Sequence, residues 1–379
     1  MRIVYLTESL PPNIDGVSYT LIQRAKFLES QKIEFRFISP FRPDRSYLFK
    51  GKVQKVHSFA FPMYTAYRVS LPLFDNLSSY LDAFDPDIIH VVSPTPLSIY
   101  GLRYGKKRGK PVVGSYHTHF VSYLKYYGFQ VLESFGWRYL RWFYNHCQQT
   151  YVPSLSTLRD LQYHGIRNLV YLPHGVDARK FSPEYRSMGL RKAIGVKGEP
   201  ILLFVGRLVE EKDLEDLNGM HRILRARGHQ FKLVIVGEGP MRHKLETRLT
   251  DAHFTGLLTD EDLSRWYASS DVFVCPSTTE TFGLVVQEAF ASGLPVIGVR
   301  KGGIRDLIQD GLNGFLAEPN NSADFAAKVE TLLQESHLRK HLGQNARAQA
   351  LHRNWEQVNA KLVQSYEMVI SNDCAFYSS

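Results

Sequence analysis

The chain has 379 residues, enough for two ordinary domains with a sizeable core in each. Hydrophobic residues make up 44% and charged residues 22%, which excludes a disordered chain, and no apolar run approaches the roughly 18–20 residues of a membrane span. Cys147, Cys275 and Cys374 are too few and too widely spaced for a disulfide framework or a zinc site, and they indicate a reducing cytoplasm.

The net charge of +9 is concentrated in the first half of the chain. Residues 1–175 hold 21 Lys and Arg against 11 Asp and Glu, whereas the remainder holds 25 against 26. Whatever anionic partner this charge attracts therefore meets the N-terminal half.

Short apolar runs alternate with longer mixed segments along the chain. The expected strands occupy residues 2–7, 34–40, 87–92, 111–117, 149–154 and 169–173 in the first half, and 201–206, 232–237, 253–256, 271–277, 294–299 and 314–318 in the second. Several are apolar on both faces and rich in Val and Ile, a pattern typical of parallel strands covered by helices on each side. The alternation predicts an α/β protein with two doubly wound, Rossmann-like domains.

A polar stretch over residues 174–199 is unfavourable to helices and predicts a linker. We therefore expect domains at 1–174 and 175–354. A final helical pattern at 355–370 could pack on either domain, and residues 355–379 could return to the first.

The loop "SLPPNIDGVSYT" joins the first strand to a helix expected to begin near Val17. Gly16 permits close approach of the backbone to a ligand. Asp15 has two interpretations, a carboxylate offered to an acceptor hydroxyl or the N-cap of the helix, and the N-cap is favoured.

His117 and His119 alternate after the fourth predicted strand. Metal ligands can show this spacing, but no third ligand lies nearby, so we expect no metal site.

Aromatic residues are interleaved with Lys125, Arg138 and Arg141 over residues 123–146, near a basic run at 103–110. This composition fits a peripheral membrane surface, and core aromatics with arginines extending to solvent would give the same pattern. It would also suit single-stranded nucleic acid, but no recognition helix or RNA-binding motif accompanies it, so we expect no nucleic-acid partner.

In the second half, Gly206 and Arg207 end a predicted strand and Lys212 precedes a helix. Ligands of doubly wound domains bind where strands end. Arg can hold a phosphate through two hydrogen bonds and Lys adds a point charge, so this loop suits two linked phosphates. Ordinary loop charges are the plainer alternative.

The stretch "ETFGLVVQEA" contains Glu280 and Glu288, which a continuous helix would separate by about 12 Å. The preceding "CPSTT" favours a loop, so we expect Glu280 in that loop. Phe282, Gly283 and Leu284 would then begin a helix whose first N–H groups suit an anion. A surface helix with acidic residues near its N-terminus is the alternative.

Together, the "GRL" loop with Lys212, the two glutamates, "VGEGP" (236–240), "PHGVD" (173–177) and "SYHTHF" (115–120) resemble the retaining family 4 glycosyltransferases of GT-B fold. The resemblance covers nearly the whole chain. "IDGVSYT" and "SYHTHFVSYLKYYG" are most similar to the branch of sulfoquinovosyl-diacylglycerol synthases and lipid-directed mannosyl- and glucosyltransferases. The resemblance implies two Rossmann-like domains that face a deep interdomain cleft. It further implies that the first domain binds the acceptor and the second binds the nucleotide sugar.

The resemblance also implies roles for residues. The implied catalytic residues are His117, Arg207, Lys212 and Glu280. The implied donor-binding residues are Gly16, Gly206, Arg207, Lys212, Gly237, Glu280, Phe282, Gly283, Leu284 and Glu288. In this assignment Arg207 and Lys212 hold the diphosphate, and Glu280 contacts the transferred sugar. Glu288 binds the ribose, and His117 lines the donor sugar. Acceptor-side candidates are Asp15, where many family members carry a second glycine, Thr118 and Tyr123.

The implied reaction is retaining transfer from a UDP- or GDP-sugar to a membrane lipid such as diacylglycerol or a related glycolipid, with no cofactor and no metal. The implied location is cytoplasmic, with peripheral attachment to the anionic inner face of the cytoplasmic membrane. A soluble or polysaccharide acceptor, or a nucleotide-sugar epimerase of the same fold, is the alternative.

Overall fold

The structure is a computed structural model that describes residues 1–44, 46–47, 49–61, 64–72, 75–126, 128 and 130–376. The chain forms two compact units. The first contains Met1–Val121, Phe129–His174 and Trp355–Ser379, and the second contains Ser122–Gly128 and Gly175–Asn354. The segment 122–128 therefore packs with the second unit, whereas the sequence-based division placed it in the first domain.

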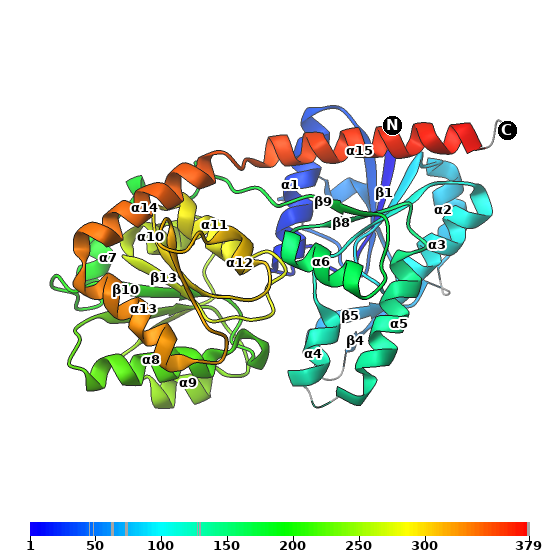
Figure 1. The fold of residues 1–379 in the computed structure, drawn as a ribbon. Coiled ribbons are helices and arrows are strands. Elements are labelled where there is room, and N and C mark those ends of the chain that lie inside the picture. Colours follow the sequence, from blue (N-terminus) through cyan, green and yellow to red (C-terminus); the bar gives the residue numbers. More distant parts are fainter. Residues whose placement is uncertain are drawn as a thin grey trace. The chain divides into compact units, whose positions relative to one another are not determined.

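The first unit is built on a seven-stranded parallel sheet with the strand order β3-β2-β1-β6-β7-β8-β9 (Figure 1). Its strands are β1 (Arg2–Leu6), β2 (Glu34–Ser39), β3 (Val53–Lys55), β6 (Ile88–Val91), β7 (Val112–Ser115), β8 (Gln149–Val152) and β9 (Leu169–Tyr171). The six predicted runs all contain strands. The short β3 and an antiparallel pair, β4 (Ser58–Phe61) and β5 (Tyr64–Ser70), are additional to the prediction.

Capping side chains determine where helices of the first unit begin. α1 (Gly16–Ser30) follows Asp15, whose side chain accepts a hydrogen bond from the Ser18 N–H, and Thr95 caps α3 (Pro96–Arg108) in the same way. The remaining helices before the second unit are α2 (Leu77–Phe84), α4 (Phe120–Tyr126), α5 (Glu133–Tyr144) and α6 (Leu155–Tyr163), with 3-10 turns η1 (Lys50–Lys52) and η3 (Gln130–Leu132).

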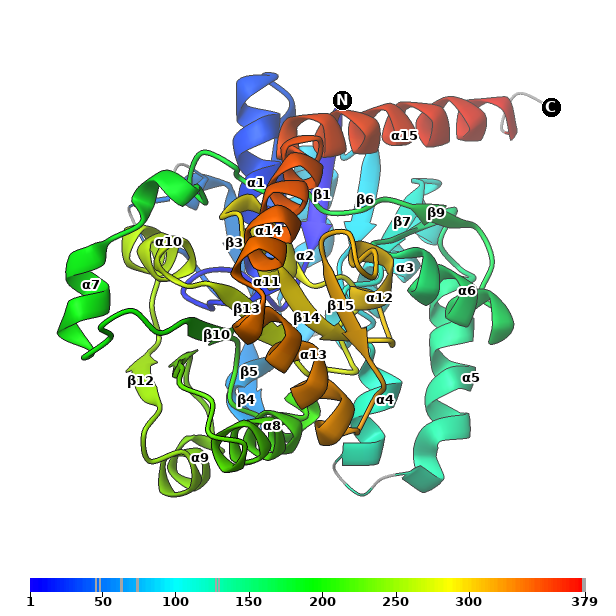
Figure 2. The same ribbon diagram turned by 60° about the vertical axis from the view of Figure 1, so that its left-hand side comes forward.

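The last helix, α15 (Trp355–Phe376), returns to the first unit and packs against α1 (Figures 1 and 2). Tyr366 is fully buried, and its hydroxyl lies 3.1 Å from the Tyr5 hydroxyl and 2.5 Å from Nδ1 of His90. Leu362 and Val369 enter the same hydrophobic core. The C-terminal helix is therefore part of the core of the first unit.

The second unit is built on a six-stranded parallel sheet with the strand order β12-β11-β10-β13-β14-β15. Its strands are β10 (Ile201–Val205), β11 (Lys232–Val236), β12 (His253–Gly256), β13 (Val272–Cys275), β14 (Val296–Val299) and β15 (Gly314–Ala317). Each lies within a predicted run, because strands that are buried on both faces are apolar throughout.

Helices cover both faces of this sheet (Figure 2). They are α8 (Leu214–Ala226), α9 (Arg242–Arg248), α10 (Asp260–Ser269), α11 (Leu284–Ala291), α12 (Ile304–Leu307), α13 (Ser322–Gln334) and α14 (Ser336–Leu351). Successive strand residues point to opposite faces. Leu203 accordingly packs in the core that contains residues of α10, α11 and α12, and Leu202 in the core that contains residues of α8, α9 and α13.

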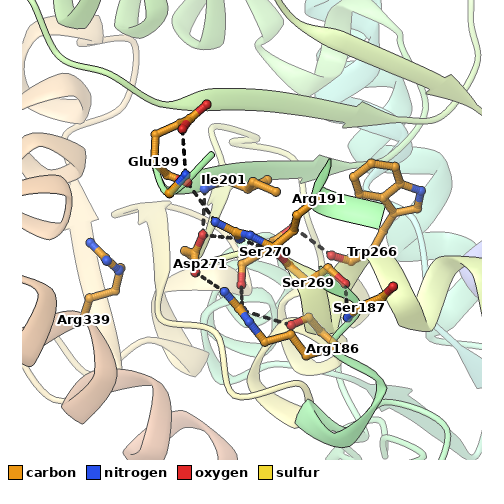
Figure 3. A network of polar contacts seen from close by, with 12 residues as sticks. Arg186, Ser187, Arg191, Glu199, Ile201, Trp266, Ser269, Ser270, Asp271 and Arg339 are labelled. Atoms are coloured by element: carbon orange, nitrogen blue, oxygen red, sulfur yellow. Dashed lines mark hydrogen bonds and ion pairs between the residues drawn. The ribbon is translucent and has the colours of Figure 1, made fainter. Parts of the chain in front are cut away.

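Within the stretch predicted as a linker, 174–199, residues 175–199 are part of the second unit. They form η4 (Pro183–Tyr185) and α7 (Met188–Ala193). The Asp271 carboxylate accepts hydrogen bonds from Arg191 Nη1 at 2.7 Å, and from Arg186 Nη2 and the Ile201 N–H at 2.8 Å each (Figure 3). Burial alone would raise the pKa of Asp271, but these hydrogen bonds hold it below its ordinary value.

Candidate functional site

Loops that follow four neighbouring strands of the second unit lie against one another at the carboxyl edge of the sheet. They span residues 206–213, 237–241, 276–283 and 300–303, after β10, β11, β13 and β14. The Gly206 N–H donates to Val236 O at 3.0 Å, and the Gly303 N–H donates to Glu280 O at 2.7 Å. Ligands of doubly wound domains bind at this edge, so these loops form the candidate donor site.

Two glycines allow the loops after β10 and β11 to approach closely. Gly237 has a φ of +142°, and a Cβ there would lie 1.9 Å from Gly206 O. A Cβ at Gly239 would lie 2.3 Å from Leu208 O. Any larger residue would separate the loops, which explains why "VGEGP" requires its glycines and how Gly237 comes to lie beside Gly206.

The structure brings Lys212 and Glu280 together. Lys212 ends the 3-10 turn η5 (Glu210–Lys212), and its Nζ forms an ion pair with Glu280 Oε1. The two side chains are only 14% and 19% exposed, so solvent screens the pair weakly. Arg207 lies in the same loop, with Nη2 3.5 Å from Glu211 Oε1. Two cations therefore lie at the edge of the sheet, each beside a carboxylate.

α11 begins four residues after Glu280. Gly283, with a φ of +96°, precedes its first residue, Leu284. The first N–H groups of a helix lack partners within the helix and bear partial positive charge. The ring of Phe282 is buried in the hydrophobic core, so the expected anion contact of this residue rests on its backbone.

Glu288 lies within α11 and is half-buried. Its Oε2 accepts a hydrogen bond from the Tyr267 hydroxyl at 2.9 Å. Burial raises the pKa of Glu288 to about 7, against the opposing effects of that hydrogen bond and of the charge of Lys180. Glu280 and Glu288 thus occupy a loop and a helix, the placement that the sequence predicts.

In the first unit, His117 follows β7 and stacks on His174, with ring centroids 5.3 Å apart and planes inclined by 20°. Burial lowers the pKa of both histidines, that of His174 to about 3, so both rings are neutral at pH 7. His119 has a different environment, because its Nε2 lies 2.8 Å from Asp160 Oδ2.

The other candidates from the N-terminal part of the chain lie in loops and in helices. Asp15 is the N-cap of α1, and both of its carboxylate oxygens also accept from the Ser9 hydroxyl at 2.7 Å, which agrees with the structural interpretation. Gly16 is the first residue of α1, and Thr118 lies between β7 and α4. Tyr123 belongs to α4, and its side chain is outside the described part of the chain.

Across the residues that the structure describes, no group of three or more His, Cys, Asp and Glu is placed to hold a metal ion. Within those same ranges, no helix is both long enough and apolar enough to cross a membrane.

Sequence reasoning missed the contacts that join the Lys212 loop to the Glu280 loop. Asp213 accepts a hydrogen bond from the Thr278 N–H at 2.7 Å, and Glu211 O accepts one from the Thr279 hydroxyl at 2.8 Å. These contacts had one sequence signal, the run Ser277, Thr278 and Thr279 after a buried strand. The hydroxyl groups of Ser and Thr commonly form hydrogen bonds with nearby backbone.

Two parallel-sheet, Rossmann-like domains, one with cations and a helix N-terminus at its strand ends, define the architecture of a nucleotide-dependent transferase of the GT-B class. The family model described as "Glycosyltransferase Family 4" matches residues 14–180, and the one described as "Glycosyl transferases group 1" matches residues 190–349. The chain belongs to the family 4 glycosyltransferases. The predicted pair of Rossmann-like domains and the predicted enzyme class, a glycosyltransferase, are therefore confirmed.

Individual relatives agree with this assignment. A GDP-mannose-dependent alpha-mannosyltransferase of Corynebacterium glutamicum is 32% identical over 98% of this chain and 90% of its own. Sulfoquinovosyl transferase SQD2 of Arabidopsis thaliana is 38% identical over 80% of this chain and 61% of its own. Sucrose-phosphate synthase from Thermosynechococcus elongatus shares the fold, with a TM-score of 0.83, 20% identity and coverage of 98% of this chain and 99% of its own.

Proposed function

We propose that this glycosyltransferase moves a sugar from a UDP- or GDP-sugar to a membrane lipid, with retention of the anomeric configuration. The observation that carries the donor half is the meeting of Arg207, Lys212 and the N-terminus of α11 at one sheet edge. Three sources of positive charge suit a diphosphate. The relative named for GDP-mannose supports the donor class.

The mechanism we propose is substitution on one face of the sugar. The acceptor hydroxyl attacks the anomeric carbon from the side of the leaving diphosphate, while the bond from that carbon to the phosphate oxygen breaks. A phosphate oxygen of the donor takes the proton of the hydroxyl, so no protein base is needed. Arg207, Lys212 and the N–H groups of residues 282–284 stabilise the charge that develops on the diphosphate.

Other residues would bind the hydroxyl groups of the donor. Glu280, held by Lys212, would accept hydrogen bonds from the transferred sugar, and Glu288 from the ribose. The neutral His117 would line the sugar. Gly206 and Gly237, whose loops are in close contact, would allow the backbone to approach the nucleotide. Gly16 and Thr118 of the first unit, and Tyr123 of the segment 122–128, remain candidates.

We further propose that the first unit attaches to an anionic membrane surface through η3 and α5. Val131, Phe135 and Trp142 are 91%, 68% and 45% exposed, and Arg138 lies among them at helical spacing. The residues of α5 that enter the core are Leu140, Phe143 and Tyr144. The aromatic stretch therefore divides between core and surface, and its surface part combines apolar side chains with cations, which suits the headgroup level of a bilayer.

A thermal-shift screen with GDP-mannose, UDP-glucose, GDP and UDP tests the donor proposal. Either the guanine or the uracil nucleotides should raise the melting temperature, because a ligand that binds only the folded state stabilises it. With the lipid acceptor, an α-linked donor should give an α-linked product by NMR, and an inverted anomer would rule out the mechanism. An epimerase would instead convert the sugar nucleotide without acceptor and release no nucleoside diphosphate.

We propose that turnover needs no metal, because Arg207, Lys212 and the N-terminus of α11 supply the positive charge that magnesium supplies elsewhere. Turnover should be unchanged by EDTA. Loss of activity that magnesium restores would contradict this proposal.

A further inference from the structure

We propose that Asp213 is a positioning residue that holds the loop after β10 against the loop after β13. The inference rests on the proposed donor site, because these loops carry Lys212 and Glu280. Asp213 binds neither donor nor acceptor in this proposal. It sets the spacing of the groups that do.

Asp213 joins three separate segments of the second unit. Its Oδ2 accepts hydrogen bonds from both the N–H and the hydroxyl of Thr278, each at 2.7 Å. Its Oδ1 accepts a hydrogen bond from the Tyr126 hydroxyl at 2.8 Å, and Tyr126 belongs to the segment 122–128 that packs with this unit. This one carboxylate therefore accepts three hydrogen bonds from two other segments and holds those segments against the loop after β10.

This arrangement violates two local preferences. Asp213 has a φ of +52°, a left-handed conformation that costs L-residues energy, although aspartate and asparagine adopt it more readily than most others. It also stands at the N-cap of α8, where an aspartate ordinarily accepts a hydrogen bond from the first turn, yet its side chain makes no cap hydrogen bond. Residues that break local rules in this way are concentrated at functional sites, where another requirement outweighs the local cost.

The requirement here is the register of the two loops. Lys212 directly precedes Asp213, and Glu280 lies two residues after Thr278, so the Asp213 contact fixes the chain at both ends of the ion pair. A second link between the same loops, from the Thr279 hydroxyl to Glu211 O at 2.8 Å, lies on the other side of Lys212. The backbone of Lys212 is therefore held on both sides and its ammonium group pairs with Glu280, as suits a group that must meet charge developing in a transition state.

The variant Asp213→Gly removes the side-chain contact between the two loops but keeps the left-handed backbone conformation. Glycine accepts a φ near +52° without strain, so the variant should fold at least as well in this turn. We expect kcat to fall about tenfold or more, because Lys212 loses its fixed position. The KM for the nucleotide sugar should be unchanged or lower, because an acid beside the diphosphate is removed. Asp213→Asn, which tolerates the left-handed conformation and keeps one acceptor, should recover part of kcat.

Asn320→Gly is the matched control, because Asn320 has a φ of +55° and is exposed in a loop of the same unit. It should keep wild-type kinetics. Circular-dichroism melting checks folding in each variant. A merely structural role for Asp213 predicts less folded protein with normal turnover per folded molecule, and Asp213→Gly with wild-type kcat at saturating donor would overturn the proposal. If Lys212→Ala also turns over normally, the proposed donor site itself fails.

Discussion

In the proposed donor site, the ion pair between Lys212 and Glu280 would link the diphosphate side to the sugar side. We expect Arg207→Ala and Lys212→Ala each to lower turnover more than a hundredfold, which needs only about 2.7 kcal/mol of lost transition-state stabilisation. Steady-state kinetics with a melting curve as the folding control measures both effects. Near-normal rates in both variants would refute the diphosphate assignment.

Glu288 gives two opposite pH dependences. Its pKa is raised from 4.5 to about 7, so the folded protein holds the proton more tightly than the unfolded chain. The stability that this provides is fully present below pH 4.5 and is lost as pH rises through 7. Donor binding should instead strengthen over pH 6 to 8, because the ionised carboxylate accepts hydrogen bonds from the ribose.

Calorimetric titration with the preferred nucleotide, together with melting curves at each pH, tests this prediction. Glu288→Gln should weaken binding and flatten both profiles. A wild-type affinity that does not change between pH 6 and 8 would contradict the ribose assignment.

The sequence predicts single residues well where the signal is local. A loop at Glu280 and a helix at Glu288 follow from the polar run after a buried strand and from the apolar pattern after Gly283. The role of Asp213 could not be predicted, because its partner Thr278 lies 65 positions away.

At the scale of elements, the stretch 174–199 shows how composition can mislead. Its polar residues predicted a linker, yet Arg186 and Arg191 bind a carboxylate from a distant part of the second unit. The helix α7 begins at a local cap from Ser187, but with only six residues it is too short to show a clear helical pattern in the sequence. The parallel strands, by contrast, were predictable because burial on both faces leaves few polar residues in them.

Asp271→Ala should therefore destabilise the second unit. Only 5% of Arg191 is exposed, and the variant removes its carboxylate partner. Leaving this buried cation without that partner should lower the free energy of unfolding by about 3 kcal/mol. Because the pKa of Asp271 is lowered, the stability that its ionisation provides is present above the ordinary pKa and is lost as pH falls below it. Urea denaturation at pH 7 measures the change. Glu261→Ala, at an exposed pair with Arg265, is the control and should change stability by less than about 1 kcal/mol.

At the scale of the whole molecule, the excess of positive charge and the exposed apolar side chains of η3 and α5 both belong to the first unit. We expect the protein to co-sediment with vesicles containing phosphatidylglycerol, to bind little to neutral vesicles, and to be released by high salt. A basic residue near such a surface contributes about 1 kcal/mol of attraction, which salt screens. Phe135→Ser with Trp142→Ser should reduce sedimentation. Met188→Ser, an exposed apolar site of the second unit, should not.

Charge variants refine this test. Arg108 and Lys110 already pair with Asp82 and Asp85. Replacing Lys106 and Lys107 by Ser should therefore account for most of the effect of replacing Lys106, Lys107, Arg108 and Lys110 together. If the intact protein ignores anionic vesicles at low salt and glycosylates a soluble sugar efficiently, the lipid-acceptor proposal fails. The donor site would be unaffected, because it depends on other residues.

The return of α15 to the first unit has a consequence for the order in which the protein is made. The first unit needs Leu362, Tyr366 and Val369 to complete its core, so its strands, which precede the second unit in the chain, wait for residues that follow the second unit to leave the ribosome. The sheet of the second unit is complete once β15 has emerged. A chain stopped after Asn354 should therefore contain a protease-resistant second unit beside a first unit that proteases digest, and equal resistance of both would contradict this order. The strands of the first unit are made before those of the second unit, but the second unit is the first able to finish folding.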